Sequence, residues 1–216
     1  MKESTSKQLE TLFSRYPALA TCRADIFAAA ETICGAYRAG RKLMVCGNGG
    51  SAADAEHIVG ELAKGFCKKR HVTADFAEKL AGIDPELGPK LAEGLERGLP
   101  ALALHSHPGL TTAFLNDVNG DWYFGQQLLA QGKKGDIFLA ISTSGNSRNI
   151  YAAAVVARAM NIPVLGLLGK TGGKVLPLCD AAVVVPEMET FKIQELHLPI
   201  YHTLCLMLEE HFFPGE

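Results

Sequence analysis

The sequence has few of the features that mark membrane, nucleic-acid-binding or secreted proteins. Its formal net charge is only -2, so no excess of positive charge predicts binding to nucleic acid or to an anionic membrane surface. The first ten residues lack the apolar core of a signal peptide, and no apolar run approaches the roughly 20 residues of a membrane span. The six cysteines show no C-x-x-C spacing, and most lie in apolar surroundings typical of reduced core residues. We therefore expect a cytoplasmic protein that binds neither nucleic acid nor membrane.

What the sequence does contain is an alternation of short apolar runs, glycine- or serine-rich turns and stretches with helical spacing. Such segments form parallel strands joined by right-handed helical crossovers. The length suits one domain. We predict a single α/β domain over 1–216, with N-terminal helices in 1–40 and a doubly wound, flavodoxin-like parallel sheet with helices on both faces in 41–216. The predicted strands are 42–46, 101–104, 137–141, 163–168 and 181–185.

Helical spacing predicts the remaining elements. Pro17 is expected to separate two helices within 4–39. The last helix, 191–212, contains Pro199, which removes one backbone hydrogen bond, so we expect either a kink or a helix that begins near Leu198. The other predicted helices are 52–64, 89–96, 122–129, 149–160 and 174–179.

The most informative stretch is the serine-rich loop at 142–147, between a buried strand and a helix. Three serines and one threonine surround Gly145 there. Hydroxyls and the unpaired N–H groups of a helix N-terminus together form a binding site for an anion. The alternative is ordinary turn chemistry, in which the same hydroxyls only stabilise the loop. The position between strand and helix favours a phosphate site, built mainly from neutral donors because the loop has no Lys or Arg of its own.

A second loop, at 47–52, also joins a strand to a helix. Its sequence GNGGSA fits G-x-G-x-x-A, the dinucleotide-binding fingerprint. That fingerprint also requires a second strand ending in an acidic residue about 20 residues further on, and the chain has none there. A nicotinamide or flavin cofactor is therefore not expected. Because both loops follow the carboxyl ends of parallel strands, they can share one site.

Polar side chains stand at helical spacing in two distant helices. His57 and Glu61 are four residues apart and share a helix face, either as an exposed pair or as part of the site that the glycine loop lines. Gln194 and His202 lie within about a quarter turn of one face of the last helix. Residues 67–110 are less informative, and His105 and His107 in that segment are expected to be surface histidines rather than metal ligands.

Three motifs in combination resemble the sugar isomerase (SIS) domain family: CGNGGSAADAEHIVGEL at 46–62, ISTSGNS at 141–147 and IQELHLPIYH at 193–202. The resemblance covers nearly the whole chain. The serine loop alone indicates only an SIS domain. His57 and Glu61 together with Gln194 and His202 resemble the branch that isomerises a seven-carbon sugar phosphate.

The resemblance implies a complete set of site residues and a homotetramer with sites at subunit contacts. Glu61 and His202 would be the acid–base pair. The implied zinc ligands are His57, Glu61, Gln194 and His202. The implied phosphate ligands are Ser142, Thr143, Ser144 and Ser147. The implied contacts to the rest of the substrate are Asn48, Gly49, Gly50, Ser51, Asn116, Asp117 and Gln194.

The chemistry of these residues agrees with aldose–ketose isomerisation, which moves a proton between C1 and C2 through an enediolate. Such a reaction needs a base and an acid within hydrogen-bond reach, and a divalent metal can polarise the carbonyl. The expected reaction converts sedoheptulose 7-phosphate to D-glycero-D-manno-heptose 7-phosphate.

Two alternatives stay open: a non-catalytic SIS protein that binds a phosphosugar and regulates or bridges a partner, and an isomerase or epimerase for another phosphosugar or a nucleotide-linked sugar. The long segment 67–110, and the lack of an aspartate at 189–192 where the family often has one, bear on the choice of sugar.

Overall fold

The computed structural model describes residues 3–215, with side chains described from residue 7 onward. Its centre is a sheet of five parallel strands in the order β2-β1-β3-β4-β5. The strands are β1 (Leu43–Cys46), β2 (Ala101–Ala103), β3 (Ile137–Ser142), β4 (Val164–Leu168) and β5 (Ala181–Val184). The parallel sheet and its flanking helices confirm the predicted fold class, and the predicted strands are correct to within one residue at each end.

The strand order reverses direction between β1 and β3. The chain leaves β1 for β2 on one side, then returns to pair β3 with the other side of β1, where Leu43 lies opposite Ile137 and Cys46 opposite Ala140. In parallel sheets, ligands bind at such a switch point, beyond the carboxyl ends of the strands. The loops that follow β1 and β3 therefore lie side by side, at the position where a ligand is expected.

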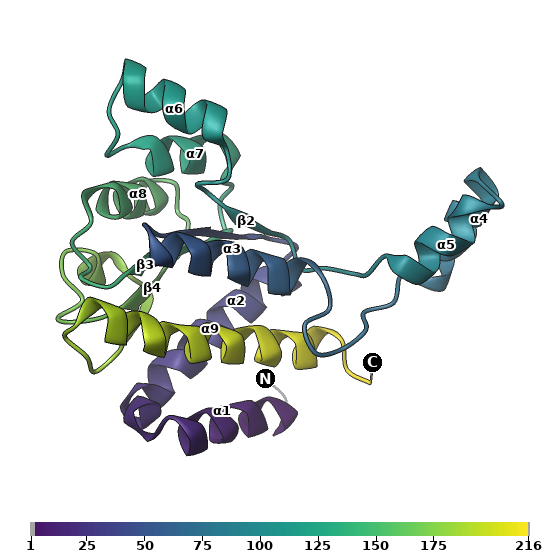
Figure 1. Cartoon of the computed structure of the whole chain (residues 1–216), viewed down its shortest axis with the longest axis horizontal. Helices are drawn as coiled ribbons and strands as arrows, with labels where there is room; N and C mark the ends of the chain where they lie inside the picture. Colours follow the sequence, from purple (N-terminus) through teal and green to yellow (C-terminus); the bar gives the residue numbers. More distant parts are fainter. Residues whose placement is uncertain (1–2, 216) are drawn as a thin grey trace.

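Helices cover both faces of the sheet (Figure 1). Helices α2 (Arg23–Arg38), α3 (Gly50–Ala63) and α9 (Thr190–Phe212) pack against one face, and α1 (Glu3–Arg15) packs against α9. Helices α7 (Tyr123–Gln131) and α8 (Arg148–Ala159) cover the other face, and α6 (Pro108–Asp117) packs on α7. Successive residues of β1 point to opposite cores, Leu43 and Val45 to the α9 side and Met44 to the α8 side, as a pleated strand requires.

The N-terminal helices separate at Pro17 as predicted. A short 3-10 helix, Pro17–Cys22, joins α1 to α2. Leu9 and Leu12 of α1 and Ile26 of α2 are buried in the same core as α9 and the sheet. The N-terminal helices are therefore part of the α/β core. Residues 1, 2 and 216 of the predicted domain lie outside the described residues.

The expectation that the last helix begins near Leu198 is wrong, because α9 runs unbroken from Thr190 to Phe212 with Pro199 inside it. A proline at this position removes the N–H that would bond the carbonyl of Glu195, and its ring crowds that carbonyl. Glu195 is exposed, and the helix continues through Pro199. The carbonyl of Pro199 in turn accepts a hydrogen bond from the Thr203 hydroxyl at 2.8 Å.

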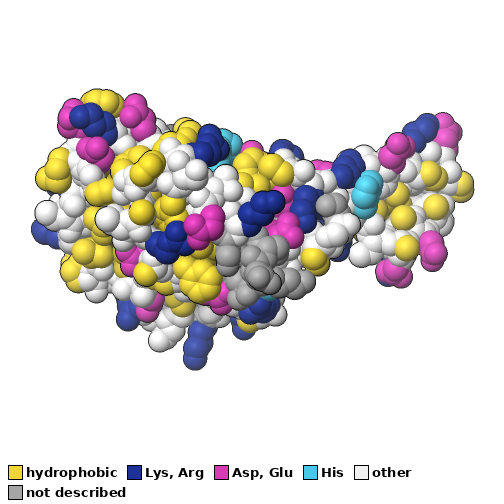
Figure 2. Space-filling model, turned by 90° about the horizontal axis from the view of Figure 1, so that it is seen from below, with side chains coloured by type: hydrophobic (Ala, Val, Ile, Leu, Met, Phe, Trp, Pro, Cys, Tyr) yellow, Lys and Arg dark blue, Asp and Glu magenta, His cyan; other side chains and the backbone are white. Residues whose placement is uncertain are grey.

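A helical hairpin of α4 (Ala74–Ile83) and α5 (Leu87–Gly94) projects from the body of the molecule (Figure 1). It carries the exposed apolar side chains of Phe76, Ile83 and Leu87, and Figure 2 shows such side chains on the hairpin among charged ones. The predicted helix at 89–96 corresponds to α5, whereas α4 and α6 were not predicted. None of the described helices has the length and apolarity needed to cross a membrane.

Candidate active site

The glycine loop after β1 and the serine loop after β3 are joined by a pair of amides. Asn48 Nδ2 donates to Asn149 Oδ1 at 3.0 Å, and Asn149 Nδ2 donates to Asn48 Oδ1 at 2.9 Å. Glycine is required at two turning points: Gly49 has φ +56° at the start of α3, and Gly145 has φ +63° and packs so closely on the Gly172 carbonyl that a side chain would collide with it. The two loops are thus held together as one structure.

Hydroxyls and helix N-termini gather at this edge of the sheet. Ser142 Oγ and Ser147 Oγ are 3.2 Å apart, Ser142 Oγ accepts from the Gly145 N–H at 3.1 Å, and Ser144 Oγ accepts from the Asn146 N–H at 3.1 Å. Thr143 is half-buried in the same loop. Within the described residues, no N-cap side chain bonds the first turn of α3 or α8. Two helix N-termini therefore offer backbone N–H groups and positive dipole ends to an anion placed between them.

A second polar cluster lies where α3 runs beside α9. His57 Nε2 is 3.2 Å from Glu61 Oε1, and the His57 ring meets the ring of His202 edge-to-face, with centroids 4.9 Å apart. The three side chains come from segments more than 140 positions apart in the chain. The structure therefore brings together His57, Glu61 and His202, which the sequence predicted from two separate spacings.

His202 lies in a sheltered environment. Its Nε2 is buried and has no hydrogen-bond partner among the described residues. Burial, and then the neighbouring His57, lower the pKa of His202 below its usual value. The ring also packs at 5.4 Å from Phe66 and borders a cavity of about 370 Å³ between α1 and α9 that Arg15 also lines. A neutral imidazole with a free nitrogen can bind a metal or exchange a proton.

The other predicted residues lie at different places around the loops. Gln194, in the first turn of α9, packs so closely against Gly50 that a Cβ there would lie 2.7 Å from Gln194 Nε2. It therefore lies beside the glycine loop, two turns of α9 before His202. Ser51 is buried under that loop. Asn116 and Asp117 are exposed at the end of α6, where Asn116 Nδ2 donates to Asp117 Oδ1 at 2.8 Å.

The donors near His57 fit a borderline metal such as zinc. Two imidazoles and a carboxylate are a typical ligand set for it, and the unpartnered Nε2 of His202 is the kind of buried atom that such an ion would satisfy. Among the described residues, no three His, Cys, Asp or Glu side chains are already arranged as a metal site. His105 is not part of such a group: its Nε2 lies 3.1 Å from Glu56 Oε1, at the edge of the sheet.

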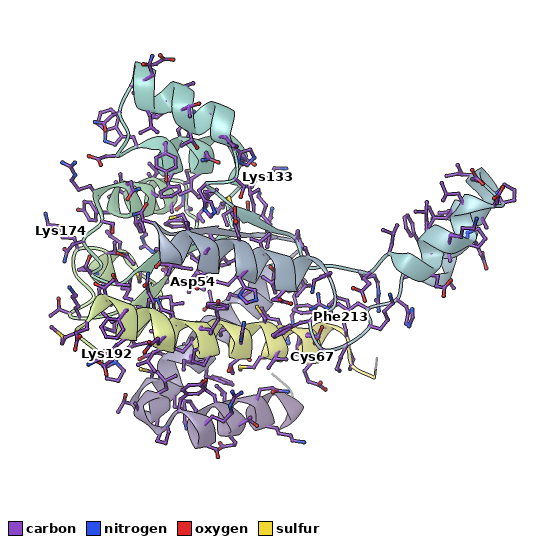
Figure 3. All side chains as sticks on the ribbon, viewed as in Figure 1. Asp54, Cys67, Lys133, Lys174, Lys192 and Phe213 are labelled. Carbon is purple, nitrogen blue, oxygen red and sulfur yellow. The ribbon has the colours of Figure 1, made fainter. Side chains whose placement is uncertain are left out.

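The sequence did not point to five further residues near the two loops and near the cluster of His57, Glu61 and His202. Asn149 joins the two loops. Tyr201 and Asp54 form hydrogen bonds behind His57, and Asp54 lies in the space between α3 and α9 (Figure 3). Lys174 and Arg148 line a cavity of about 720 Å³ beside Asn146, so the serine loop has basic neighbours that its own sequence lacks. The contacts of Asn149, Tyr201 and Asp54 span more than 100 positions and leave no local sequence signal.

Comparison with known proteins identifies the family. A model described as "SIS domain" matches residues 14–83 and 91–169. The chain belongs to the SIS domain family. The gap between the two matched segments, residues 84–90, covers the turn between α4 and α5 and the first four residues of α5 in the projecting hairpin.

Several relatives carry one enzymatic name. Phosphoheptose isomerase from Nitratiruptor sp. is 38% identical over 190 residues, 88% of this chain and 88% of the relative. Phosphoheptose isomerase from Aneurinibacillus thermoaerophilus is 40% identical over 180 residues, 83% of this chain and 78% of the relative. The solved structure of phosphoheptose isomerase from Neisseria gonorrhoeae has a TM-score of 0.72 and 28% identity, over 96% of this chain and 97% of the other. This SIS-domain chain is therefore an enzyme of the isomerase class.

Proposed function

We propose that the chain is an aldose–ketose isomerase that converts sedoheptulose 7-phosphate to D-glycero-D-manno-heptose 7-phosphate. The observation that carries the proposal is that His57 and Glu61 of α3 lie beside His202 of α9. Helix α3 begins at the glycine loop. The names of the relatives support a phosphorylated heptose as substrate. An imidazole pair beside a carboxylate favours a catalytic role over a purely regulatory, phosphosugar-binding one.

In the proposed mechanism, the serine loop holds the phosphate. The hydroxyls of Ser142, Thr143, Ser144 and Ser147 and the N–H groups of α8 bind its oxygens. Lys174 borders this loop in the adjoining cavity and adds positive charge, whereas Arg148 there is paired with Asp121 at 3.1 Å. Asn48, Gly49, Gly50, Ser51, Asn116, Asp117 and Gln194 contact the sugar. The phosphate thereby fixes where C1 and C2 lie relative to the polar cluster.

Glu61 acts as the base that moves the proton between C1 and C2, and His202 exchanges the proton of the hydroxyl and carbonyl oxygens. The side chain of Glu61 is only 14% exposed, which limits competition from water for its proton. His202 is held neutral by burial and by His57, so it can accept a proton and return it.

His57, Glu61, Gln194 and His202 would hold a divalent metal, with zinc the ion that suits these donors. When bound, the metal supplies positive charge that stabilises the enediolate oxygens. His57 then acts as a ligand rather than as an acid or base. Gln194, a neutral amide, would contribute the weakest of the four bonds.

We also propose a homotetramer with sites near subunit contacts, located in the cytoplasm. The large cavity on α7 and α8 is bordered by the exposed apolar side chains of Trp122, Leu129 and Val155, which a partner subunit would cover. The six cysteines all lie within the described residues and are unpaired, as in a reducing compartment. Light scattering coupled to size-exclusion chromatography measures the assembly, and a monomer that retains full activity would contradict it.

The substrate is tested with a panel of ketose phosphates of five, six and seven carbons, with product formation followed by NMR. The expected result is the highest kcat/KM for sedoheptulose 7-phosphate. A higher value for another phosphosugar would change the substrate but keep the reaction, whereas no conversion of any member by a folded oligomer would favour a binding protein.

A further inference from the structure

Behind His57, a buried tyrosine hydroxyl bridges two residues of α3. Tyr201 of α9 is 1% exposed, and its hydroxyl donates to Asp54 Oδ1 at 3.2 Å and lies 3.0 Å from His57 Nδ1. Asp54 and His57 are three residues apart, so they share a face of α3. They therefore hold the hydroxyl from two sides, across the contact between the two helices that carry the proposed catalytic groups.

The direction of these hydrogen bonds follows from the number of protons. A phenol has one proton to donate, and an aspartate carboxylate only accepts. With the Tyr201 proton directed at Asp54, the Tyr201 oxygen can only accept, so the second partner, His57 Nδ1, must carry the N–H. A neutral imidazole protonated at Nδ1 has a lone pair at Nε2.

The lone pair on Nε2 faces Glu61. His57 Nε2 lies 3.2 Å from Glu61 Oε1, and two acceptors at this distance do not form a hydrogen bond. In the opposite tautomer, Nε2–H would donate to Glu61, and both side chains would be occupied by each other. The tautomer therefore decides whether the Nε2 atom of His57 and the Oε1 atom of Glu61 are free, while Glu61 Oε2 accepts from Lys64 Nζ at 3.4 Å in either case.

We propose that Asp54 and Tyr201 form a positioning chain that fixes His57 in the Nδ1–H tautomer and keeps Nε2 and Glu61 available for a metal ion or substrate. Neither residue touches the reacting atoms. The link to catalysis rests on the proposed isomerase function, whereas the tautomer itself does not. A hydrogen bond to the second nitrogen of a histidine ligand orients the ring and raises its basicity, and losing it typically costs 10- to 100-fold in metal affinity or activity.

The chain offers variants that separate positioning from packing. Tyr201→Phe keeps the ring and removes the acceptor for His57 Nδ1–H. Asp54→Ala frees the Tyr201 proton to turn toward His57, whereas Asp54→Asn keeps an acceptor oxygen for it. The matched control is Tyr37→Phe, because Tyr37 is also a buried tyrosine and its hydroxyl has no hydrogen-bond partner among the described residues.

The decisive experiment is long-range ¹H–¹⁵N NMR of the histidine rings in the metal-free full-length chain, with the His57 signals assigned by His57→Gln. The wild type, Asp54→Asn and Tyr37→Phe should show the Nδ1–H tautomer at His57. Tyr201→Phe and Asp54→Ala should show the Nε2–H tautomer. An Nε2–H or doubly protonated His57 in the wild type, or an unchanged signal in both Tyr201→Phe and Asp54→Ala, would overturn the proposal.

Zinc affinity gives an independent readout on the same proteins. Competition with a chromophoric chelator should show binding weakened 10- to 100-fold in Tyr201→Phe and unchanged in Tyr37→Phe. If the tautomer changes as expected but none of the proteins binds zinc or isomerises a sugar phosphate, the positioning chain stands and the proposed function fails. If the wild type binds zinc and is active while Tyr201→Phe has unchanged affinity and kcat, the positioning role fails and the function stands.

Discussion

Asn48 and Asn149 exchange two side-chain hydrogen bonds, at 3.0 and 2.9 Å, and so link the loops that follow the first and third strands. The two residues are far apart in the chain and adjacent only because β1 pairs with β3. The pair sets the spacing between the proposed sugar-binding and phosphate-binding loops. The proposed site therefore depends on the observed strand order, which places β3 beside β1.

Removing this link should weaken substrate binding more than turnover. Each hydrogen bond contributes about 0.5–1.5 kcal/mol, so Asn149→Ala should raise KM about tenfold, since about 1.4 kcal/mol corresponds to a factor of ten. Asn149→Asp should be worse, because a carboxylate cannot donate to Asn48 and repels the phosphate. Steady-state kinetics measures both variants, and an Asn149→Asp protein with the wild-type KM would contradict the proposed role of the pair.

The serine loop gives a second binding prediction. Ser147→Ala removes a hydroxyl that pairs with Ser142 at 3.2 Å and that is proposed to bind phosphate, so KM should rise while the melting temperature stays near that of the wild type. Ser144→Ala should act in the same direction. Ser106→Ala is the matched control, because Ser106 is exposed on a different loop and donates to Glu56. Unchanged KM values in both loop variants would argue against a phosphate at 142–147.

The sequence was most informative where local pattern and tertiary environment agree. Strands such as Ile137–Ser142 are buried throughout, so a continuous apolar run predicted them. Helix α4 was missed although Phe76, Leu80 and Ile83 recur at helical spacing; none of its residues is buried, so this apolar stripe faces away from the core. The predicted last helix, 191–212, is confirmed as Thr190–Phe212, whereas the alternative start near Leu198 is wrong because the helix continues through Pro199.

The candidate site was likewise predictable only in part from local sequence patterns. The spacing of His57 and Glu61 predicted a shared face, and their side chains do meet. The hydrogen bond between His57 and Tyr201 joins residues 144 positions apart and follows only from the packing of α3 on α9. The exposure of Asn116 and Asp117 likewise depends on how α6 packs on the rest of the molecule, and no local pattern encodes it.

We expect a buried ion pair near the end of α3 to contribute strongly to the free energy of unfolding. Arg70 is fully buried, donates to Glu209 at 2.9 Å, and also donates to the carbonyls of Glu61 and Leu62. Glu209→Gln leaves the Arg70 charge without its partner, which should lower the free energy of unfolding by about 3–5 kcal/mol. Urea denaturation measures the loss. Glu10→Gln, which breaks an exposed pair with Arg23, is the control and should leave the urea midpoint within error.

Acid should destabilise the fold through His197. This buried ring donates from Nε2 to the Leu168 carbonyl at 3.1 Å, and its buried Nδ1 has no partner among the described residues. Burial lowers the pKa of His197 to about 4. Because the folded pKa lies below the unfolded value of about 6.5, the unfolded chain binds the proton first as the pH falls.

The stability linked to His197 is therefore fully present above pH 6.5 and is lost as the pH falls toward 4. A difference of about 2.5 pKa units corresponds to roughly 3 kcal/mol. Urea denaturation between pH 7 and pH 4 measures this slope. His197→Gln can still donate to Leu168 but does not titrate, so its slope should be shallower. Equal slopes for the two proteins would exclude His197 as the source.

The claim that Glu61 is the base of an isomerase is tested most directly by the initial rate at which Glu61→Gln converts sedoheptulose 7-phosphate, followed by NMR at saturating substrate. Glutamine keeps the size of the side chain but cannot accept the proton, so turnover should fall about a hundredfold or more, the scale of general base catalysis. The circular dichroism spectrum and melting temperature should match those of the wild type. A correctly folded Glu61→Gln protein that turns over at the wild-type rate would contradict the mechanism.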